Sequence, residues 1–317
     1  MKNLNIQKNA PPLASIIIPT YNRSRLLKYT IDSILEQSID SRFLQIIVVD
    51  DGSSDDTKEV VKPYFSKVNF KYFYQEDKGY RVSKARNTGI LNADAPLCIF
   101  ADASVILGKH AVEEHLKIHG SCTGPCAVIG YVYGFDDYNR DSSKLLELVD
   151  VKNPDKSISE LKKLGICDSR EPLYQKYGDD LSKWPAPWVI FWTCHVSVPK
   201  AALIQANLFD EAYTSWGGED TDLALALEKN NVRFVMSRSV ESIHYPHGKN
   251  PGFYESFDDV FMKKKRRMDA KYHTTATKLW LTTACEDLNE KLLKMESSNI
   301  CLNRGDAYEV QHYHSIL

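Results

Sequence analysis

One short segment of the chain combines an aromatic ring, two glycines and two acids, and it consists of Trp216, Gly217, Gly218, Glu219 and Asp220. A helix is predicted to begin near Glu219, and the dipole at a helix N-terminus favours the anionic form of an acid. An anionic Asp220 could therefore accept a proton from a sugar hydroxyl. Trp216 and the glycines could form a flat surface on which a sugar ring stacks. The alternative is that the two acids only cap the helix.

Candidates for binding a nucleotide and its phosphates lie earlier in the chain. The run DKGYRVSKARNTGI contains Arg81, Lys84 and Arg86, and the planar guanidinium of arginine suits phosphate oxygens. A solvated helix face is the alternative, and it suits Lys84 better. Asp51 lies in a turn directly after a predicted strand, where its carboxylate could accept a hydrogen bond from a base N–H. Asp50 and Asp51 could instead only build the turn and cap the next helix.

A metal site is predicted from residues that follow two other strands. Asp102 ends an apolar strand, where an unpaired carboxylate is costly and a metal ion or a diphosphate would relieve that cost. A structural salt bridge would relieve it equally. His244 and His247 lie three residues apart just after a strand, and an imidazole there could be a further ligand of a transition-metal ion.

The elements that must position these residues form an alternating pattern from Ala14 to about Asp102. Short β-branched runs alternate with helical patterns, and the predicted strands are 15–18, 46–49, 71–74 and 97–100. Such alternation predicts an α/β fold with parallel strands and helical crossovers. Ligands of such sheets bind beyond the carboxyl ends of the strands, and the candidate residues follow those ends.

The rest of the chain is less regular. The sequence predicts a strand at 127–133, a polar insert at about 136–183, an apolar stretch at 188–198 and a strand at 233–236. We interpret the insert as an elaboration of the acceptor side or a lid. Trp184, Trp188 and Trp192 could line an acceptor groove or pack in the core.

After Pro251 the composition becomes helical and basic, with its densest charge at 263–267. We interpret this basic run as a solvated helix face. Contact with a membrane surface or with an anionic acceptor is the alternative.

Bulk properties exclude several classes of protein. The chain has 317 residues and a formal net charge of −2, which gives no reason to expect nucleic-acid binding. The sequence contains neither a signal-peptide pattern nor an apolar run long enough to span a bilayer, so we expect a cytoplasmic protein without a transmembrane segment. The seven cysteines have spacings that match neither a disulfide framework nor a zinc site.

Five ordered motifs resemble those of family-two inverting glycosyltransferases of the GT-A fold: SIIIPTYNR, IIVVDDGSSDDT, KGYRVSKARNTGI, IFADAS and SWGGEDTDLALAL. The last motif is similar to the catalytic segment of galactosyltransferases and chondroitin polymerases. The resemblance covers roughly residues 14 to 248. It implies a GT-A (Rossmann-like) domain over residues 1–250, with a mostly parallel sheet flanked by helices, a nucleotide-sugar half at about 14–104 and an acceptor half at about 105–250. A helical C-terminal extension at 251–317 would follow.

The resemblance also implies roles for individual residues. The donor would be a nucleotide diphosphate sugar, with UDP as the expected carrier. Its binding residues would be Pro19, Tyr21, Arg23, Asp51, Arg86 and Asp102. Asp220 would be the catalytic base, Glu219 would position the acceptor, and Trp216, Gly217 and Gly218 would bind a glycan or another hydroxyl-bearing acceptor.

One position departs from the family pattern. The metal-binding Asp-x-Asp motif is reduced to Asp102-Ala103-Ser104, and a hydroxyl is a weaker ligand than a carboxylate for Mn²⁺ or Mg²⁺. Three alternatives follow: an ion held by Asp102 with His244 or His247, a metal-free site in which Arg86 stabilises the diphosphate, or a non-catalytic relative that only binds a sugar nucleotide or glycan. The intact segment ending in Asp220 favours an active enzyme that inverts the configuration of the transferred sugar.

Overall fold

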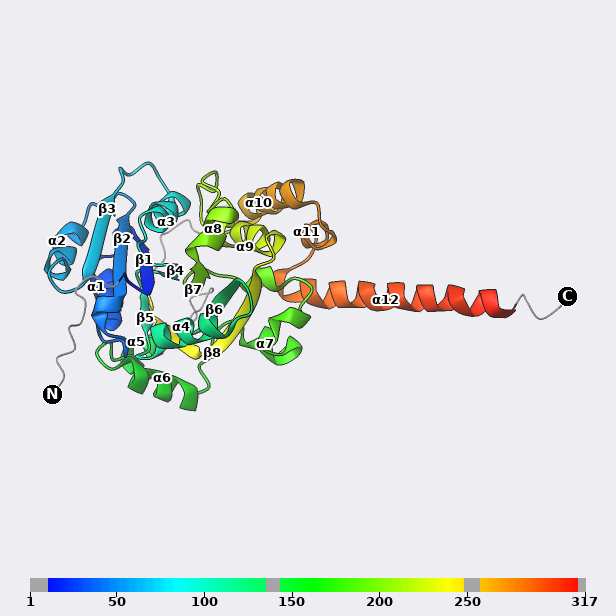
Figure 1. Cartoon of the computed structure of the whole chain (residues 1–317), viewed down its shortest axis with the longest axis horizontal. Helices are drawn as coiled ribbons and strands as arrows, with labels where there is room; N and C mark the ends of the chain where they lie inside the picture. The colour runs from blue at the N-terminus through cyan, green and yellow to red at the C-terminus, as the bar shows by residue number, and fades with distance from the viewer. Residues whose placement is uncertain (1–10, 135–142, 248–256, 313–317) are drawn as a thin grey trace.

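The computed structural model describes the backbone of residues 11–134, 143–247 and 257–312, and the side chains of 11–134, 145–247 and 260–298. Within these residues, eight strands form one mixed sheet in the order β3-β2-β1-β4-β7-β6-β8-β5 (Figure 1). The strands are β1 (Ala14–Thr20), β2 (Leu44–Asp50), β3 (Asn69–Tyr74), β4 (Leu97–Ala101), β5 (Val105–Leu107), β6 (Cys126–Tyr133), β7 (His195–Pro199) and β8 (Arg233–His244). The predicted α/β class with a mostly parallel sheet is confirmed, since four of the seven neighbouring pairings are parallel.

The first half of the sheet is the parallel part that the sequence predicted. β1 pairs with both β2 and β4, and β2 pairs with β3. Helices α1 (Ser24–Leu35), α2 (Thr57–Val61) and α3 (Val82–Leu91) connect these strands. Every residue of β2 and β4 is buried, which explains why these strands are continuous apolar runs. The register places Thr20 beside Asp50 and Asp50 beside Tyr74, so the three carboxyl ends lie together.

The second half of the sheet contains the antiparallel pairings. β7 runs antiparallel to β4 and β6, and β5 runs antiparallel to β8. β8 extends well beyond the predicted 233–236, because its register against β6 jumps from Ser237 to Glu241 and the strand then continues to His244. Because polar residues at this bulge interrupt the apolar pattern, sequence analysis did not predict the second part of the strand.

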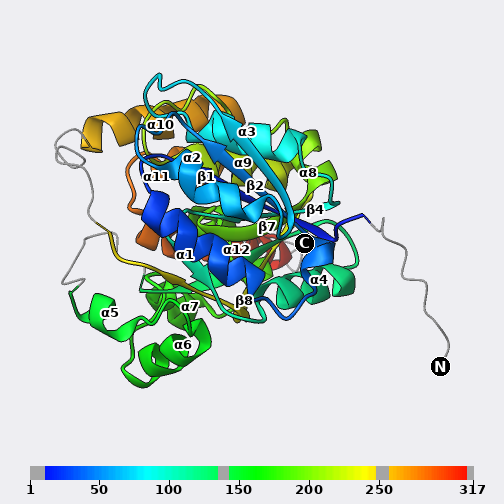
Figure 2. The same cartoon turned by 90° about the vertical axis from the view of Figure 1, so that its left-hand side faces the viewer.

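The remaining helices cover the sheet on both sides. α4 (Ala111–Ser121) and α8 (Lys200–Gln205) flank the central strands, and the insert contains α5 (Ser143–Leu148), α6 (Pro154–Lys163) and α7 (Glu171–Tyr177). Figure 2 shows these three helices on the opposite side of the molecule from α3 and α10. Trp184 and Trp188 are 5% and 1% exposed, so both belong to the core and do not line a groove.

The helical C-terminal segment packs against the same core. It consists of α10 (Phe257–Tyr272), α11 (Thr275–Trp280) and α12 (Cys285–His312), and the last of these extends away from the body (Figure 1). Trp280 and Met268 are buried, and the Trp280 ring lies 5.2 Å from that of Trp188. In the part of the chain that the structure describes, no helix is long and apolar enough to cross a bilayer.

Candidate active site

The end of β2 separates two neighbouring acids into different functions. Asp50 accepts hydrogen bonds from the backbone N–H groups of Gly52 and Ser53, so it builds the turn. Asp51 instead accepts from Gln75 Nε2 at 2.5 Å and from the backbone N–H of Arg81 at 2.8 Å. Asp50 therefore has the structural role of shaping the turn. Asp51 instead faces the loop that follows β3.

The other residues predicted for the nucleotide pocket lie at the same edge of the sheet. Pro19 is the Cα partner of Val49 near the end of β1. Tyr21 follows directly, is 42% exposed and donates a hydrogen bond of 2.9 Å to Asp77. Arg23 is half-buried, and burial lowers the pKa of its guanidinium. The structure thus brings Pro19, Tyr21 and Asp51 to adjoining strand ends.

A single buried guanidinium connects three of the predicted acids. Arg86, on α3, is 4% exposed. Its Nη1 lies 3.1 Å from Glu219 Oε1 and 3.3 Å from Asp220 Oδ1, and its Nη2 lies 3.2 Å from Asp102 Oδ1. Burial alone would lower the pKa of Arg86, but the charges of Asp220, Asp102 and Glu219 outweigh burial and raise it. Arg86 is therefore a permanent cation at the centre of the acid cluster.

The surroundings of Asp220 shift the pKa of its carboxyl group strongly. Burial and the neighbouring Glu219 raise its pKa from 3.8 to about 7, against the opposing effects of Arg86 and Thr193. Its side chain is 21% exposed, so the carboxylate is accessible at the surface of the site. A carboxylate with a pKa near neutrality suits the transfer of a proton at physiological pH.

Sequence analysis missed Thr193 as a contact of the candidate base. Its hydroxyl lies 2.5 Å from Asp220 Oδ1 and its backbone N–H lies 3.1 Å from Oδ2. The available signal was a polar residue inside the predicted apolar stretch at 188–198. Because Asp220 is 27 residues further along the chain, only the fold reveals the contact.

The glycine-rich loop before α9 (Glu219–Lys229) has a backbone that requires glycine. Gly218 precedes the helix with φ of +92°, and an added Cβ would lie 3.1 Å from Tyr213 and 3.2 Å from Lys264. Lys264 Nζ donates to the carbonyl oxygens of Ser215 and Trp216. Trp216 is 41% exposed.

The interpretation of residues 263–267 as a solvated face is wrong for two of its lysines. Lys264 and Lys265 are 8% and 6% exposed. Lys265 Nζ donates to two backbone carbonyls and lies 4.9 Å from the centre of the Trp280 ring, which compensates for its burial. Arg267 is exposed but is paired with Asp210 at 2.7 Å. Most of the charge in this run therefore serves internal contacts.

The predicted metal ligands converge only in part. The pairing of β5 with β8 places Val105 beside His244, and Ser104 Oγ lies 3.2 Å from His244 Nε2. The rings of His244 and His247 lie 5.2 Å apart. Among the described residues, no three His, Cys, Asp or Glu side chains form a group that could hold a metal ion.

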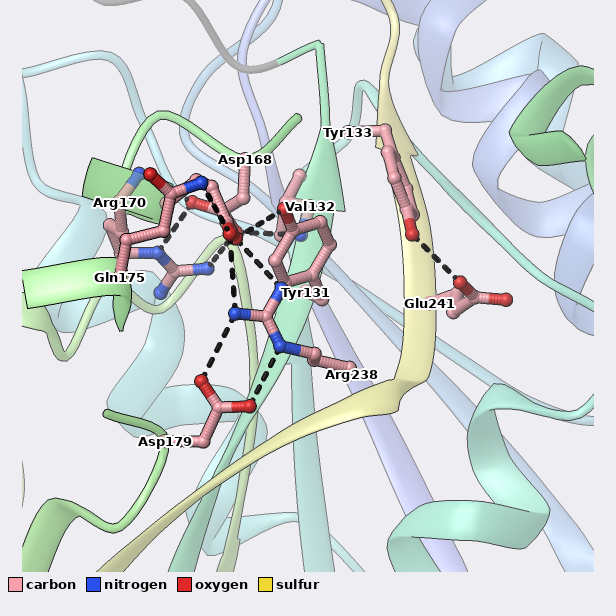
Figure 3. Close-up of polar contacts among 10 residues, drawn as sticks. Tyr131, Val132, Tyr133, Asp168, Arg170, Gln175, Asp179, Arg238 and Glu241 are labelled. Atoms are coloured by element: carbon pink, nitrogen blue, oxygen red, sulfur yellow. Dashed lines mark hydrogen bonds and ion pairs between the residues drawn. The ribbon is translucent and has the colours of Figure 1, made fainter. Parts of the chain in front are cut away.

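A cluster of charged residues connects the insert to strands β6 and β8 (Figure 3). Arg170 and Asp168 are 1% and 2% exposed and form an ion pair of 2.6 Å. Asp168 also accepts from the backbone N–H of Val132 on β6. On the outer side, Arg238 of β8 pairs with Glu171 of the insert at 2.7 Å. Residues 168–171 therefore pack as a fixed part of the fold.

The mixed α/β sheet with its flanking helices has the GT-A fold, as two solved glycosyltransferase structures show. The mannosyltransferase PcManGT from Pyrobaculum calidifontis, in complex with GDP-Man and Mn²⁺, matches with a TM-score of 0.58 and 16% identity, over 96% of this chain and 82% of its own. TarS residues 1–349 from S. aureus, in complex with UDP-GlcNAc, matches with a TM-score of 0.57 and 17% identity, over 81% of this chain and 66% of its own.

The chain belongs to glycosyl transferase family 2, which matches residues 15–178. Residues 178–248 match the N-terminal domain of galactosyltransferase. The resemblance of the motifs to family 2 and to galactosyltransferases is thereby confirmed.

Relatives in sequence agree with this assignment. Validoxylamine A glucosyltransferase of Streptomyces hygroscopicus subsp. jinggangensis (strain 5008) is 37% identical over 240 residues, which cover 74% of this chain and 56% of the relative. Chondroitin synthase of Escherichia coli is 28% identical over 244 residues, which cover 75% of this chain and 35% of that protein. The chain thus spans about half the length of the glucosyltransferase that it matches.

Proposed function

We propose that this chain is an inverting glycosyltransferase that transfers a hexose from a UDP-sugar to an acceptor hydroxyl in glycan or polysaccharide biosynthesis. The observation that carries the proposal is the position of Asp220, an accessible carboxylate with a pKa of about 7 that contacts Arg86 at 3.3 Å. Asp220 is suited to accept a proton, and Arg86 is a fixed cation suited to stabilise the charge of a leaving diphosphate.

The proposed reaction is a single in-line displacement. Asp220 accepts the proton of the acceptor hydroxyl as its oxygen forms a bond to the anomeric carbon of the donor sugar. The bond from that carbon to the diphosphate oxygen breaks, and the nucleoside diphosphate leaves toward Arg86 and Asp102. Attack from the opposite face turns an α-linked donor into a β-linked product.

Unsatisfied polar atoms support ligand binding at this place. Within the described part of the chain, Glu219 Oε2 and Arg86 Nε are buried without a hydrogen-bond partner. Such atoms are costly unless a ligand or water satisfies them. Glu219 is suited to accept a hydrogen bond from a sugar hydroxyl, and the exposed ring of Trp216 is suited to stack on the acceptor.

A divalent cation fits the charge of the cluster. Three carboxylates and one guanidinium carry a net charge of −2 when Asp220 is ionised, which would repel a diphosphate. Asp102 and His244 would hold Mn²⁺ or Mg²⁺ together with diphosphate oxygens, with His247 as a further candidate ligand. The ion would supply positive charge to the leaving group. The Mn²⁺ complex of PcManGT is consistent with such a requirement.

The nucleotide is proposed from Asp51 and from the structural relatives. Asp51 would accept a hydrogen bond from the base, and Pro19, Tyr21 and Arg23 would line the pocket around it. TarS has been solved with UDP-GlcNAc, whereas PcManGT has been solved with GDP-Man. We propose UDP as the carrier nucleotide, and a panel of UDP- and GDP-sugars tests that choice directly.

The experiment is release of nucleoside diphosphate from a panel of UDP- and GDP-sugars, with and without manganese. We expect slow hydrolysis of one UDP-sugar by the wild-type protein and a loss of about a thousandfold in Asp220→Asn, with donor binding retained. Tight binding of a donor without any turnover would instead favour a non-catalytic sugar-nucleotide-binding protein, the alternative suggested by Ser104. Near-normal turnover by Asp220→Asn would refute the assignment of the base.

A further inference from the structure

One residue holds both oxygens of the candidate base. Thr193 lies between the short 3₁₀ helix η4 (Pro187–Ile190) and β7, and its side chain is fully buried. Its hydroxyl donates to Asp220 Oδ1 at 2.5 Å, and its backbone N–H donates to Oδ2 at 3.1 Å. Two donors from one residue fix the plane of the carboxylate, which a single contact could not do.

We infer that Thr193 is a positioning residue that orients the Asp220 carboxylate and favours its anionic form. The inference rests on the proposed function of Asp220 as the base. Hydrogen bonds to a carboxylate stabilise the charged form, and here they oppose burial and Glu219. Without Thr193, Asp220 would hold its proton at neutral pH and would be unable to accept one from the acceptor.

The backbone that carries Thr193 is itself fixed by the buried arginine of Figure 3. Arg170 donates to the carbonyl oxygen of Ile190 at 3.0 Å, and its guanidinium lies 5.0 Å from the centre of the Trp192 ring. Asp168 neutralises the charge of Arg170. The residues directly before Thr193 are therefore held rigidly, as a precise orientation of Asp220 requires.

The first test compares Thr193→Val with Thr193→Ser. Valine keeps the shape of threonine but removes the hydroxyl donor, whereas serine keeps the donor. We expect the acid limb of the pH profile of kcat/KM to move upward by about one to two pH units in Thr193→Val, because a hydrogen bond to a charged group is worth that much. The plateau of kcat should fall about tenfold with little change in the KM for the donor. Thr193→Ser should keep the acid limb and the plateau of kcat close to those of the wild type.

Thr57 offers a matched control. Its hydroxyl and backbone N–H donate to one carboxylate oxygen of Asp55 at 2.5 and 3.0 Å, and its side chain is also fully buried. Thr57→Val should lower thermal stability to a similar degree as Thr193→Val but leave the acid limb in place. An unmoved limb in Thr193→Val, or an equal shift in Thr57→Val, would overturn the inference.

A second measurement needs no turnover. The difference in unfolding free energy between the wild type and Asp220→Asn, followed from pH 4 to pH 9, reports the pKa of Asp220 in the free protein. The same difference measured in the Thr193→Val background should change at a pH about one to two units higher. A pH dependence that is identical in both backgrounds would refute the inference even if no donor is found. A shifted dependence without any transferase activity would support the Thr193 contact and refute the proposed function alone.

Discussion

Lys264 Nζ lies 2.9 Å from the carbonyl oxygen of Ser215, so α10 of the C-terminal segment supports the loop that leads into α9. The same ammonium donates to the carbonyl oxygen of Trp216. A second contact strengthens the connection, because Lys271 of α10 lies 2.6 Å from the buried Asp222 of α9. Helix α10 is thus structurally connected to the loop and helix that carry the candidate base.

Removing the ammonium of Lys264 should therefore disturb both stability and turnover. Lys264→Met keeps an aliphatic side chain of similar length but leaves two carbonyl oxygens without their donor, which costs about 1–3 kcal/mol. We expect a lower melting temperature and reduced donor hydrolysis. Lys263→Met is the matched control, because Lys263 is exposed and should tolerate the change. Equal melting temperatures for the two variants would contradict the structural contribution of Lys264.

The rate of transfer should depend on pH through Asp220. Its pKa of about 7 is raised mainly by burial, and a base must be unprotonated to act. We expect kcat/KM to fall about tenfold per pH unit below pH 7 and to level off above it. Glu228, at the other end of α9, has a pKa that burial also raises to about 7, so Glu228→Gln is a matched control and should leave this limb unchanged. A flat profile between pH 5.5 and pH 8 would contradict the assignment.

The raised pKa of Asp220 also means that its ionised carboxylate destabilises the folded state. Its folded pKa of about 7 lies above the ordinary value of 3.8, so the folded protein binds this proton more tightly than the unfolded chain does. Stability from this group is present below about pH 4 and is lost as pH rises toward 7. We expect Asp220→Asn to melt about 2–4 °C above the wild type at pH 8, with the gain disappearing toward pH 4. A lower melting temperature at pH 8 would contradict this balance.

The sequence predicted the elements whose local pattern follows from their burial. β1, β2 and β4 are buried on both faces and therefore read as apolar runs. β5 has only three residues, too few for a periodic signal, although it places Ser104 beside His244. Lys264 is charged in sequence but buried in the fold, because its partners are carbonyls of a loop 48 and 49 residues earlier. Contacts of this kind depend on the tertiary arrangement and leave no local pattern.

A chain of neutral polar groups crosses the core away from the site. His119 Nε2 lies 2.7 Å from Ser197 Oγ, which lies 2.8 Å from His115 Nδ1, and His115 Nε2 lies 3.3 Å from His195 Nε2. The two facing Nε2 atoms can share only one hydrogen. Burial lowers the pKa of His195 to about 3 and of His119 to about 4, and it lowers that of His115 strongly as well.

The three buried histidines of this hydrogen-bonded set should contribute less to the stability of the folded protein in mild acid. The three folded pKa values lie below the ordinary value of 6.5, so stability is present above pH 6.5 and is lost as pH falls and the unfolded state takes up protons. We expect the three histidines together to contribute about 4 kcal/mol less stability at pH 5.5 than at pH 7.5, about a third of which His119→Gln should remove in urea unfolding, while protonation of Asp220 acts in the opposite direction over the same range. His110→Gln alters an exposed histidine and should remove none. An equal loss of stability in the wild type, His119→Gln and His110→Gln would contradict the conclusion that burial lowers the pKa of His119.

Restoring the second acid of the Asp-x-Asp motif should strengthen metal binding. Ser104 already contacts His244, so an aspartate at position 104 would place a second carboxylate beside Asp102 and the imidazole. Because hard divalent ions prefer carboxylates to hydroxyls, we expect Ser104→Asp to lower the manganese concentration for half-maximal donor hydrolysis about tenfold. Ser104→Asn has nearly the same size without the charge and should not improve it. If both variants require as much manganese as the wild type, position 104 does not face the ion, and the proposed placement of the metal between Asp102 and His244 is wrong.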